Sequence, residues 1–367
     1  MKRSILAAAL VMSGALMGSA QATEVGLRGA IDLGLTVSHT TNGTTLSETA
    51  NNYVGSEVTL FGEENLANNN VVGFNLTAGF NPDDGRFDSE EARMFNHESQ
   101  VYLKGDWGQF GMGRMSSFAT GLGTQSWLVQ FDAFEAAFAD AGLHASQQSI
   151  FARYSNSLYY ASPEMGGVRV GLFYSMTGDE SDVEAAHVQD NERYWNVATR
   201  WDNDRFGVLL SLEGTERSNL DSMKDGLVFK LAAKANLGPV TMMGGYSHAE
   251  HQEDYAFGTW AANAIYRMDD GIEKTSGIRS DAAYVGMQIP FGHSQFNAQY
   301  QYLDGRNTDT QTDFKRHVVA AGVYHYLSQR TMLYGVVSWS KGTGALSKTI
   351  DPDSNASNLH IGMTHFF

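Results

Sequence analysis

Residues 357–367 alternate between apolar and small polar side chains, and the segment ends on an aromatic residue. One face carries Leu359, Ile361, Met363, His365 and Phe367, and the other carries Asn358, His360, Gly362 and Thr364. A repeat of two residues predicts a β-strand. An apolar face opposite a small polar face suits a strand that has lipid on one side and water on the other. Soluble β-sandwiches also alternate, so the rest of the chain decides between these settings.

The same alternation recurs at residues 27–38, 72–80, 168–175, 227–237 and 296–302. Basic side chains lie on the polar faces of these stretches, namely Arg28, Arg169, Lys230 and Lys234. A packed core would bury these charges without enough partners. We therefore predict that the polar face lines water inside a barrel.

The connections between the alternating stretches are of two kinds, short turns and long polar loops. The short turns are expected at residues 65–70, 105–108, 162–166, 202–204, 237–239, 290–294 and 327–330. The long loops are expected at residues 38–52, 81–96, 116–150, 178–191, 214–226, 249–280, 304–314 and 341–357. Fifteen connections make sixteen strands. An even strand count, with short connections on one rim and long ones on the other, is typical of an outer-membrane barrel.

The predicted fold class is therefore all-β, a transmembrane antiparallel β-barrel of about 16 strands. Closure of the barrel leaves no unpaired strand edge in lipid. Small barrels fill their interior with side chains, whereas a barrel near sixteen strands leaves an aqueous channel. Beyond the first 22 residues, no stretch approaches the ~18 continuous apolar residues of a membrane helix.

The first 22 residues have the pattern of an export signal. Lys2 and Arg3 precede an apolar run from Ile5 to Met17, and small residues then lead to Ala22. This pattern predicts a signal peptide at residues 1–22. A membrane anchor is the alternative, but the apolar run is shorter than a membrane span. Residues 23–367 would then be a single pore domain, since no linker or change in composition divides them.

Composition and charge narrow the function further. The chain has 25 basic and 41 acidic residues, and loss of Lys2 and Arg3 leaves 23 against 41, a net charge of −18. Nucleic acid is excluded as a partner on this ground, because binding it needs a basic surface. The chain has no cysteine, so no disulfide framework supports an exported fold.

Several short blocks follow one another in a characteristic order and spacing. They are residues 27–34 (LRGAIDLG), 55–62 (GSEVTLFG), 108–114 (GQFGMGR), 156–163 (NSLYYASP), 327–331 (LSQRT) and the terminal Phe367. In these blocks the chain resembles the general-diffusion porins of the Gram-negative outer membrane, in particular the neisserial and comamonad type. The resemblance extends over nearly the whole length.

The resemblance implies a sixteen-stranded barrel in the outer membrane that assembles as a homotrimer and needs no cofactor. It implies a water-filled channel for ions and small hydrophilic solutes, in contact with outer-membrane lipid. The terminal aromatic residue, Phe367, would belong to the assembly signal that the barrel-insertion machinery reads. Trp107, Tyr160 and Phe367 are expected near the periplasmic boundary, where an aromatic ring can lie at the level of the lipid headgroups.

The resemblance also implies that a long third external loop folds into the barrel and narrows the channel. Residues 115–150 form the longest connection at that position. The acids Asp132, Glu135 and Asp140 of this loop would face the basic residues Arg28, Arg114 and Arg153 of the wall. Arg114 shares the apolar parity of its strand, so we place it at the junction between strand and loop. An ordinary solvated loop is the alternative.

Glu57 departs from the pattern of the family, which commonly carries an arginine after the Gly-Ser of that block. A reversed charge in a narrow, partly desolvated gap changes the local field strongly. The expectation is a channel that weakly prefers cations or is nearly non-selective. The alternative is a wall carboxylate paired with a neighbouring arginine or lysine.

No enzyme motif stands out in the chain. The densest histidine cluster, residues 248–254, leaves a strand for a long loop, which is a poor setting for a fixed metal site. No Gly-x-Ser-x-Gly elbow, His-Glu-x-x-His pair or phosphate-binding glycine loop is present. We therefore predict no catalytic residue and no metal site. A barrel hydrolase, and an adhesin or structural barrel, are the alternative functions.

Overall fold

The computed structural model describes residues 24–88, 93–120, 122–138, 141–142, 153–177, 190–218, 223–252, 276–347 and 355–367. The expected signal peptide at residues 1–22 lies outside the described residues, and so does Asp140. The expected third loop at residues 115–150 is described in part.

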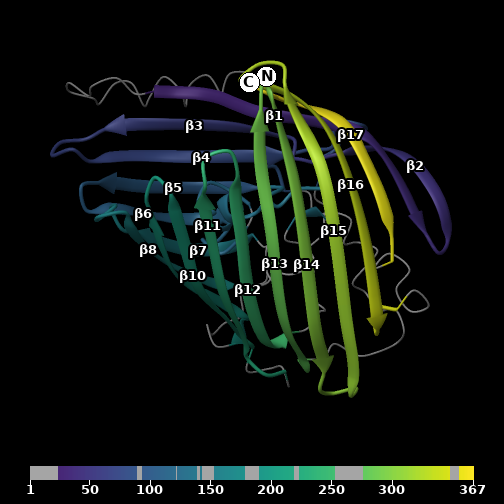
Figure 1. Ribbon diagram of the computed structural model, residues 1–367. Helices are drawn as coiled ribbons and strands as arrows, with labels where there is room; N and C mark the ends of the chain where they lie inside the picture. Colours follow the sequence, from purple (N-terminus) through teal and green to yellow (C-terminus); the bar gives the residue numbers. More distant parts are fainter. Residues whose placement is uncertain are drawn as a thin grey trace, which may run out of the picture.

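The described residues form one antiparallel sheet of seventeen strands (Figure 1). The strands are β1 (Glu24–Thr40), β2 (Gly43–Ala50), β3 (Glu57–Asn65), β4 (Val71–Gly79), β5 (Glu98–Gly105), β6 (Gly108–Met115), β7 (Tyr154–Ala161), β8 (Val168–Thr177), β9 (Arg193–Asp202), β10 (Phe206–Glu216), β11 (Gly226–Asn236), β12 (Thr241–Gln252), β13 (Ile278–Phe291), β14 (Ser294–Asn307), β15 (Thr312–Tyr326), β16 (Thr331–Gly344) and β17 (Ser357–Phe366). A short 3-10 helix, η1 (Leu128–Phe131), lies in the connection between β6 and β7. None of the helical residues described here forms a segment long and apolar enough to cross a membrane.

The sheet closes into a barrel of sixteen strands. Strand β1 pairs with β17 along one edge, and along the other edge it pairs with both β2 and β3. Residues 33–40 of β1 pair with β2, and residues 24–30 pair with β3. Strands β2 and β3 are therefore two halves of one barrel strand, interrupted at residues 51–56. The predicted fold class is confirmed.

The expectation of a long loop is wrong at two places in the chain. Residues 38–52 were expected as a loop, but most of them lie in β1 and β2, which are joined by a tight turn at residues 41–42. The segment reads as polar because it is rich in threonine, a β-branched residue that suits a strand. Residues 304–314 also lie mostly in strands, where the ion pairs Asp304–Lys315 and Arg306–Asp313 join β14 to β15.

Side chains alternate between the two faces of the barrel as the sequence predicts. On β1, Leu27 and Leu35 point outward and are 62% and 53% exposed, while Asp32 and Thr36 point inward and are buried. On β17, Ile361 points outward and His360 points inward. The apolar outer face is what a membrane-spanning barrel presents to lipid.

Aromatic residues lie at the short-turn end of the outer face. The rings of Trp107 and Tyr160 stack with their centroids 6.4 Å apart, and the Tyr160 hydroxyl donates a hydrogen bond of 2.8 Å to the Trp107 carbonyl. Phe367 follows β17 and exchanges two backbone hydrogen bonds of 3.0 Å with Gly29 of β1. These positions are compatible with the expected aromatic girdle, and the level of the membrane itself stays a prediction.

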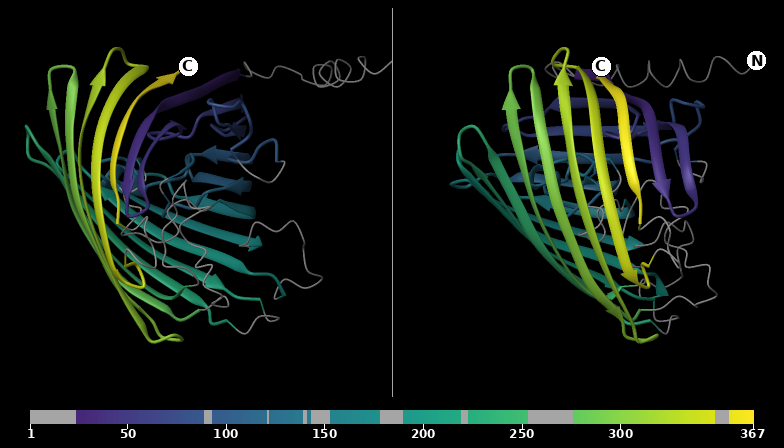
Figure 2. Two further views of the ribbon diagram at one scale, coloured as in Figure 1. Left: turned by 90° about the vertical axis from the view of Figure 1, so that its right-hand side faces the viewer. Right: turned by 45° about the vertical axis from the view of Figure 1, so that its right-hand side comes forward.

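The wall of the barrel is not equally tall all the way round. In Figure 2 the purple hairpin of β1 and β2 ends well short of the level that the green and yellow strands β13 to β16 reach. The long strands extend on the side of the long loops, opposite the short turns.

Candidate functional site: the pore constriction

The connection from β6 to β7, here called the third loop, folds into the barrel. Its backbone is held by side chains on the inner face of the wall. Tyr284 of β13 donates a hydrogen bond of 3.0 Å to the carbonyl of Phe131, and Gln288 donates one of 3.1 Å to that of Ala133. Gln299 and Gln301 of β14 both donate to the carbonyl of Ala141, at 3.2 and 3.1 Å. The inward fold that the family resemblance implied is therefore present.

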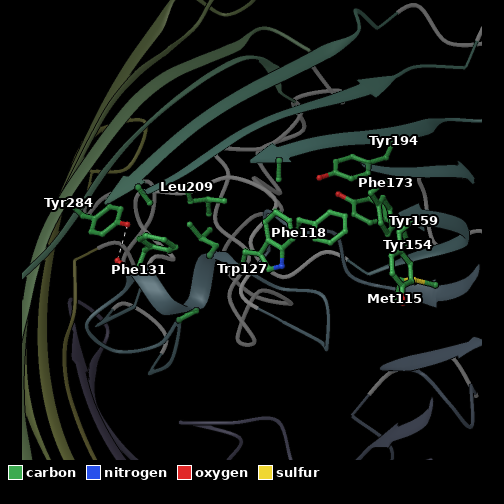
Figure 3. Packing of buried hydrophobic residues seen from close by; sticks show 14 residues of the cluster. Met115, Phe118, Trp127, Phe131, Tyr154, Tyr159, Phe173, Tyr194, Leu209 and Tyr284 are labelled. Atoms are coloured by element: carbon green, nitrogen blue, oxygen red, sulfur yellow. Dashed lines mark hydrogen bonds between the residues drawn. The ribbon is translucent and has the colours of Figure 1, made fainter. Parts of the chain in front are cut away.

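Apolar packing holds the loop as firmly as these hydrogen bonds. The loop buries a series of large side chains, namely Phe118, Trp127, Leu128, Phe131, Phe134 and Phe138. Figure 3 shows Phe131 beside Tyr284 of the wall, and Phe118 beside Trp127. Phe118 packs over Gly171 of β8, where an added Cβ would lie 2.6 Å from its ring.

The packed aromatic residues are the part of the site that the sequence reasoning missed. Five aromatic side chains would contribute little to the stability of a solvated loop, because such side chains stabilise a protein mainly when they are buried. Their number in residues 116–142 was therefore a readable signal of an inward fold. The expectation of an inward loop rested on the resemblance instead.

The carboxylate of Asp132 is buried and accepts two hydrogen bonds from the loop's own backbone. The donors are the amides of Phe134, at 3.0 Å, and Ala136, at 2.9 Å. Such a carboxylate shapes the loop, in the manner of an Asx turn. Its expected role opposite a wall arginine stays a prediction.

Glu135 lies in residues 135–138 of the third loop, here called the loop tip, and accepts a hydrogen bond from the hydroxyl of Tyr53, in the interruption between β2 and β3. Burial raises the pKa of the Glu135 carboxyl, and the hydrogen bond from Tyr53 only partly offsets this effect. The carboxyl is therefore more easily protonated than an ordinary glutamate.

The backbone at the loop tip is strained. Glu135, Ala136 and Phe138 have φ values of 58°, 60° and 58°, a left-handed conformation that non-glycine residues rarely adopt. Each such residue costs about 1–3 kcal/mol and persists only where its surroundings hold it. The tip therefore keeps its shape through its contacts with the wall.

Glu57 lies on the inner face of β3, with its side chain 36% exposed. One of its oxygens lies 2.8 Å from Nδ1 of His97, and Nε2 of the same ring lies 2.6 Å from an oxygen of Asp88. His97 fits because Gly79 has no side chain, since an added Cβ there would lie 2.1 Å from its Nε2. The partner of Glu57 is thus a histidine, in place of the arginine or lysine that the alternative expected.

Asp88 connects this histidine to the expected basic cluster. Although burial raises the pKa of Asp88, the hydrogen bond and charge of His97 and the charge of Arg153 outweigh it and hold the pKa below its ordinary value. Asp88 is therefore ionised at neutral pH.

The three wall arginines do not form one cluster. Arg28 is exposed on the inner face of β1, with its guanidinium carbon 5.1 Å from the centre of the Phe61 ring. Arg114 lies one residue before the end of β6 and donates to the Asn96 carbonyl at 2.9 Å and the Ser155 hydroxyl at 3.0 Å. The positive charge of Arg153 helps to lower the pKa of Asp88, in the loop that follows β4. Arg114 also donates to the Arg153 carbonyl at 3.5 Å, so these two residues lie together. Arg28 stays on the wall, where it opposes Thr59, two residues from Glu57 on β3.

The other inward-facing basic residues differ in their access to water. Lys230 is fully buried beneath the third loop, where its ammonium lies 2.7 Å from Glu213 and donates a hydrogen bond of 3.1 Å to the Ala119 carbonyl. The expectation that it faces water is wrong, because the inward loop covers it and supplies a partner. Lys234 is partly exposed, pairs with Asp202 at 3.3 Å and lies 5.2 Å from the centre of the Phe131 ring.

Arg169 lies on the inner face of β8 near a short turn and is about half exposed. Its Nε is 3.7 Å from Glu164. Opposite it in the neighbouring strand stands Arg200, which bonds to Asp202 and to Gln130 of the third loop. Basic groups thus continue along the inner wall from β8 to β11.

Three kinds of comparison with known proteins agree. The family model of the Gram-negative porins matches residues 6–345 of the chain. An outer membrane porin protein of Bordetella pertussis is 26% identical, with 100% of each chain covered. Outer membrane porin protein 32 of Delftia acidovorans is 24% identical over 85% of this chain and 84% of its own.

The solved structures show the same fold. An anion-selective porin from Comamonas acidovorans superposes with a TM-score of 0.71, at 21% identity, over 94% of this chain and 100% of its own. OmpF of Salmonella typhi superposes with a TM-score of 0.65, at 11% identity, over 95% of this chain and 100% of its own.

Proposed function

The chain belongs to the family of Gram-negative porins, proteins of the outer membrane, and we propose that it forms a water-filled channel for passive diffusion of ions and small hydrophilic solutes. The observation that carries the proposal is the third loop, which crosses the interior of a closed barrel whose inner wall keeps exposed charges. Such a loop narrows the interior of the barrel.

The selectivity proposed for the channel is a weak preference for cations or near neutrality. Partly exposed charges of both signs line the wall from β1 to β5, namely Arg28, Glu57, Glu63 and Lys104. Lys104 pairs with Glu63, so Arg28 and Glu57 with its histidine partner remain to set the local field. The anion-selective porin from Comamonas acidovorans has the same fold, but fold alone does not determine the sign of this field.

The proposed assembly is a homotrimer, and two features of β2 support contact with another subunit. Strand β2 pairs with β1 along one edge, and no strand of the described residues pairs with its other edge. Its Glu48 points outward beside Leu35, which in turn opposes Ile361 of β17, and these two apolar side chains are 53% and 55% exposed. Lipid tolerates neither an unpaired strand edge nor an ionised carboxylate.

The depth of Glu48 in the membrane follows from the position of Leu35, its partner on β1. Leu35 lies six residues beyond Gly29, where Phe367 closes the barrel. Six residues span about 20 Å along a strand and, at a tilt near 45°, about 14 Å across the membrane. That distance is roughly half of the apolar thickness, so a protein surface covers this side in the proposed trimer.

Liposome swelling tests the function. Vesicles that contain the purified protein should swell in isotonic solutions of small sugars, at rates that fall with sugar size. Lipid and peptide substrates should remain intact, which separates a porin from a barrel hydrolase. Vesicles that stay closed to every sugar would contradict the proposal and favour an adhesin or structural barrel.

A further inference from the structure

The interruption between β2 and β3, residues Asn51–Ser56, is here called the inner segment. It begins at Asn51, whose φ of 62° turns the chain away from the sheet. Asn51 and Ser56 are buried, and Tyr53 contacts residues on the inner face of the barrel, with its ring 5.4 Å from that of Tyr324 on β15. The segment thus enters the space that the third loop also occupies.

Asp32 of β1 holds the inner segment in place. Its carboxylate accepts hydrogen bonds from the amides of Asn52, at 2.7 Å, and Tyr53, at 3.3 Å. The backbone of Asp32 adds two more contacts, because its amide donates to the Ser56 hydroxyl at 2.9 Å and its carbonyl accepts from the Asn51 amide at 3.1 Å. One residue therefore binds both ends and the middle of the segment.

The same carboxylate reaches two further strands. The hydroxyl of Tyr334 on β16 donates to it at 3.2 Å, and the hydroxyl of Thr364 on β17 donates to it as well. Asp32 is completely buried. It joins the inner segment to three neighbouring wall strands and has no exposed surface of its own.

On its other side the inner segment holds the tip of the third loop. The amide of Phe138 donates a hydrogen bond of 2.6 Å to the Asn52 carbonyl, and the Tyr53 hydroxyl donates to Glu135. The Phe138 ring lies between Tyr53, at 5.9 Å, and Tyr334, at 4.9 Å. The strained tip thus depends on contacts with the inner segment.

The contact between the segment and the loop is not filled completely. A cavity of about 180 Å³ lies beside it, lined by residues 51–55, the loop tip, Leu122, Val129 and Phe366. A tip that lost its hold on the inner segment would therefore have space to move.

We propose that Asp32 is a positioning residue of the channel, which sets the width of the passage by holding the inner segment against the tip of the third loop. The proposal rests on the proposed channel function. The width of the passage would then depend on a carboxyl group that is completely buried and does not contact the solute. The chemistry is that of a buried anchor, in which one carboxyl group accepts hydrogen bonds from four donors in three elements.

Single-channel recording of Asp32→Ala and Asp32→Asn tests the proposal. Asp32→Ala removes the anchor, so the unit conductance should rise and the open channel should become noisy. Asp32→Asn keeps an oxygen that can accept from the Asn52 amide. The hydroxyl groups of Tyr334 and Thr364 can reorient and accept a hydrogen bond from the new side-chain amide nitrogen. The conductance and the noise of Asp32→Asn should therefore lie between those of Asp32→Ala and the wild type.

Two further variants separate positioning from general stability. Tyr53→Phe removes only the hydroxyl that reaches Glu135 and should raise the noise in the same direction. Because Asp32 and Tyr53 act in one series of contacts, the double variant should be no noisier than Asp32→Ala. Asn297→Ala is the matched control, since Asn297 is a buried polar residue of the inner wall whose described partner is Gln295 of its own strand. It should keep the wild-type conductance.

The outcomes separate this inference from the proposed function. A wild type that never conducts would contradict the channel itself and this inference with it. A conducting wild type with folded Asp32→Ala channels of unchanged conductance and noise would overturn the inference alone. If Asp32→Ala does not fold, unchanged conductance and noise in both Asp32→Asn and Tyr53→Phe would overturn it.

Discussion

The ammonium of Lys230 lies 2.7 Å from a carboxylate oxygen of Glu213 on the neighbouring strand, and both side chains are buried. The pair lies beneath the third loop, and Lys230 reaches the Ala119 carbonyl of that loop. The third loop thus packs on a buried charged pair of the barrel wall.

Breaking this pair should be costly, whereas replacing both partners should not. Lys230→Met leaves the buried carboxylate of Glu213 without a positive partner, with only the hydrogen bond from the Tyr194 hydroxyl, and should destabilise the barrel by about 3–5 kcal/mol. The double variant Lys230→Met with Glu213→Leu should recover most of that loss, because the unpaired charge is gone. Unfolding in denaturant, followed by the heat-modifiable band on gels, measures both. Equal losses in the single and double variants would show that the pair itself stabilises the loop.

Glu57 should influence ion selectivity. Glu57→Arg changes the local charge by two, which at roughly 8 Å from a passing ion in water is worth on the order of 1 kcal/mol, or about a fivefold change in relative permeability. The reversal potential in asymmetric salt should move toward anions, and the shift should shrink as salt screens the field. Asp106→Arg, in a short turn outside the barrel, makes the same charge change and should move the potential less. Equal shifts would remove Glu57 from the constriction.

The strand pattern was readable from the sequence because alternation is local. The outward positions of Leu27, Ile31 and Leu35 follow from parity alone, and the structure agrees. Contacts between distant segments could not be read in this way. The bond between Glu57 and His97 joins residues 40 positions apart, and Asp32 meets Thr364 across the closure of the barrel. Parity predicted that Asp32 faces inward, and the family resemblance placed Glu57 at the constriction, but neither could name the partners of these acids.

The burial of Lys230 shows where parity misleads. An inward side chain of a large barrel faces water only where no loop covers it. The third loop covers β11 because its aromatic residues, such as Phe131, have to be buried. The sequence contained that requirement in the composition of the loop, while the place where the loop docks depends on the folded wall.

Acid should strengthen the hold on the loop tip. Burial raises the pKa of Glu135 above its ordinary value of 4.5, so the docked loop binds the proton more tightly than a released loop does. The resulting stabilisation is complete below pH 4.5 and is lost as the pH rises through the raised pKa. Open-channel noise should therefore increase as the pH rises through that window. Glu135→Gln should be quiet throughout, and a variant that keeps the wild-type pH dependence would assign the effect to another group.

Phe367 should matter for assembly. Its amide and carbonyl each bond to Gly29, at 3.0 Å, so it adds the last pair of hydrogen bonds where β17 closes on β1. Deletion of Phe367 removes this pair and the outward aromatic ring together. The amount of folded, heat-modifiable barrel in the outer membrane should fall, whereas Phe367→Tyr should keep it near the wild type. Normal amounts of folded barrel after the deletion would show that the terminal residue is dispensable.

A barrel narrowed by its third loop should conduct ions passively, and single-channel recording in asymmetric salt measures this conduction and its selectivity together. The purified wild-type protein in a planar bilayer should open in discrete steps with a conductance proportional to salt. Its reversal potential should be near zero or weakly on the cation side. A membrane that stays closed would contradict passive conduction, and a strongly anion-selective channel would contradict the proposed selectivity.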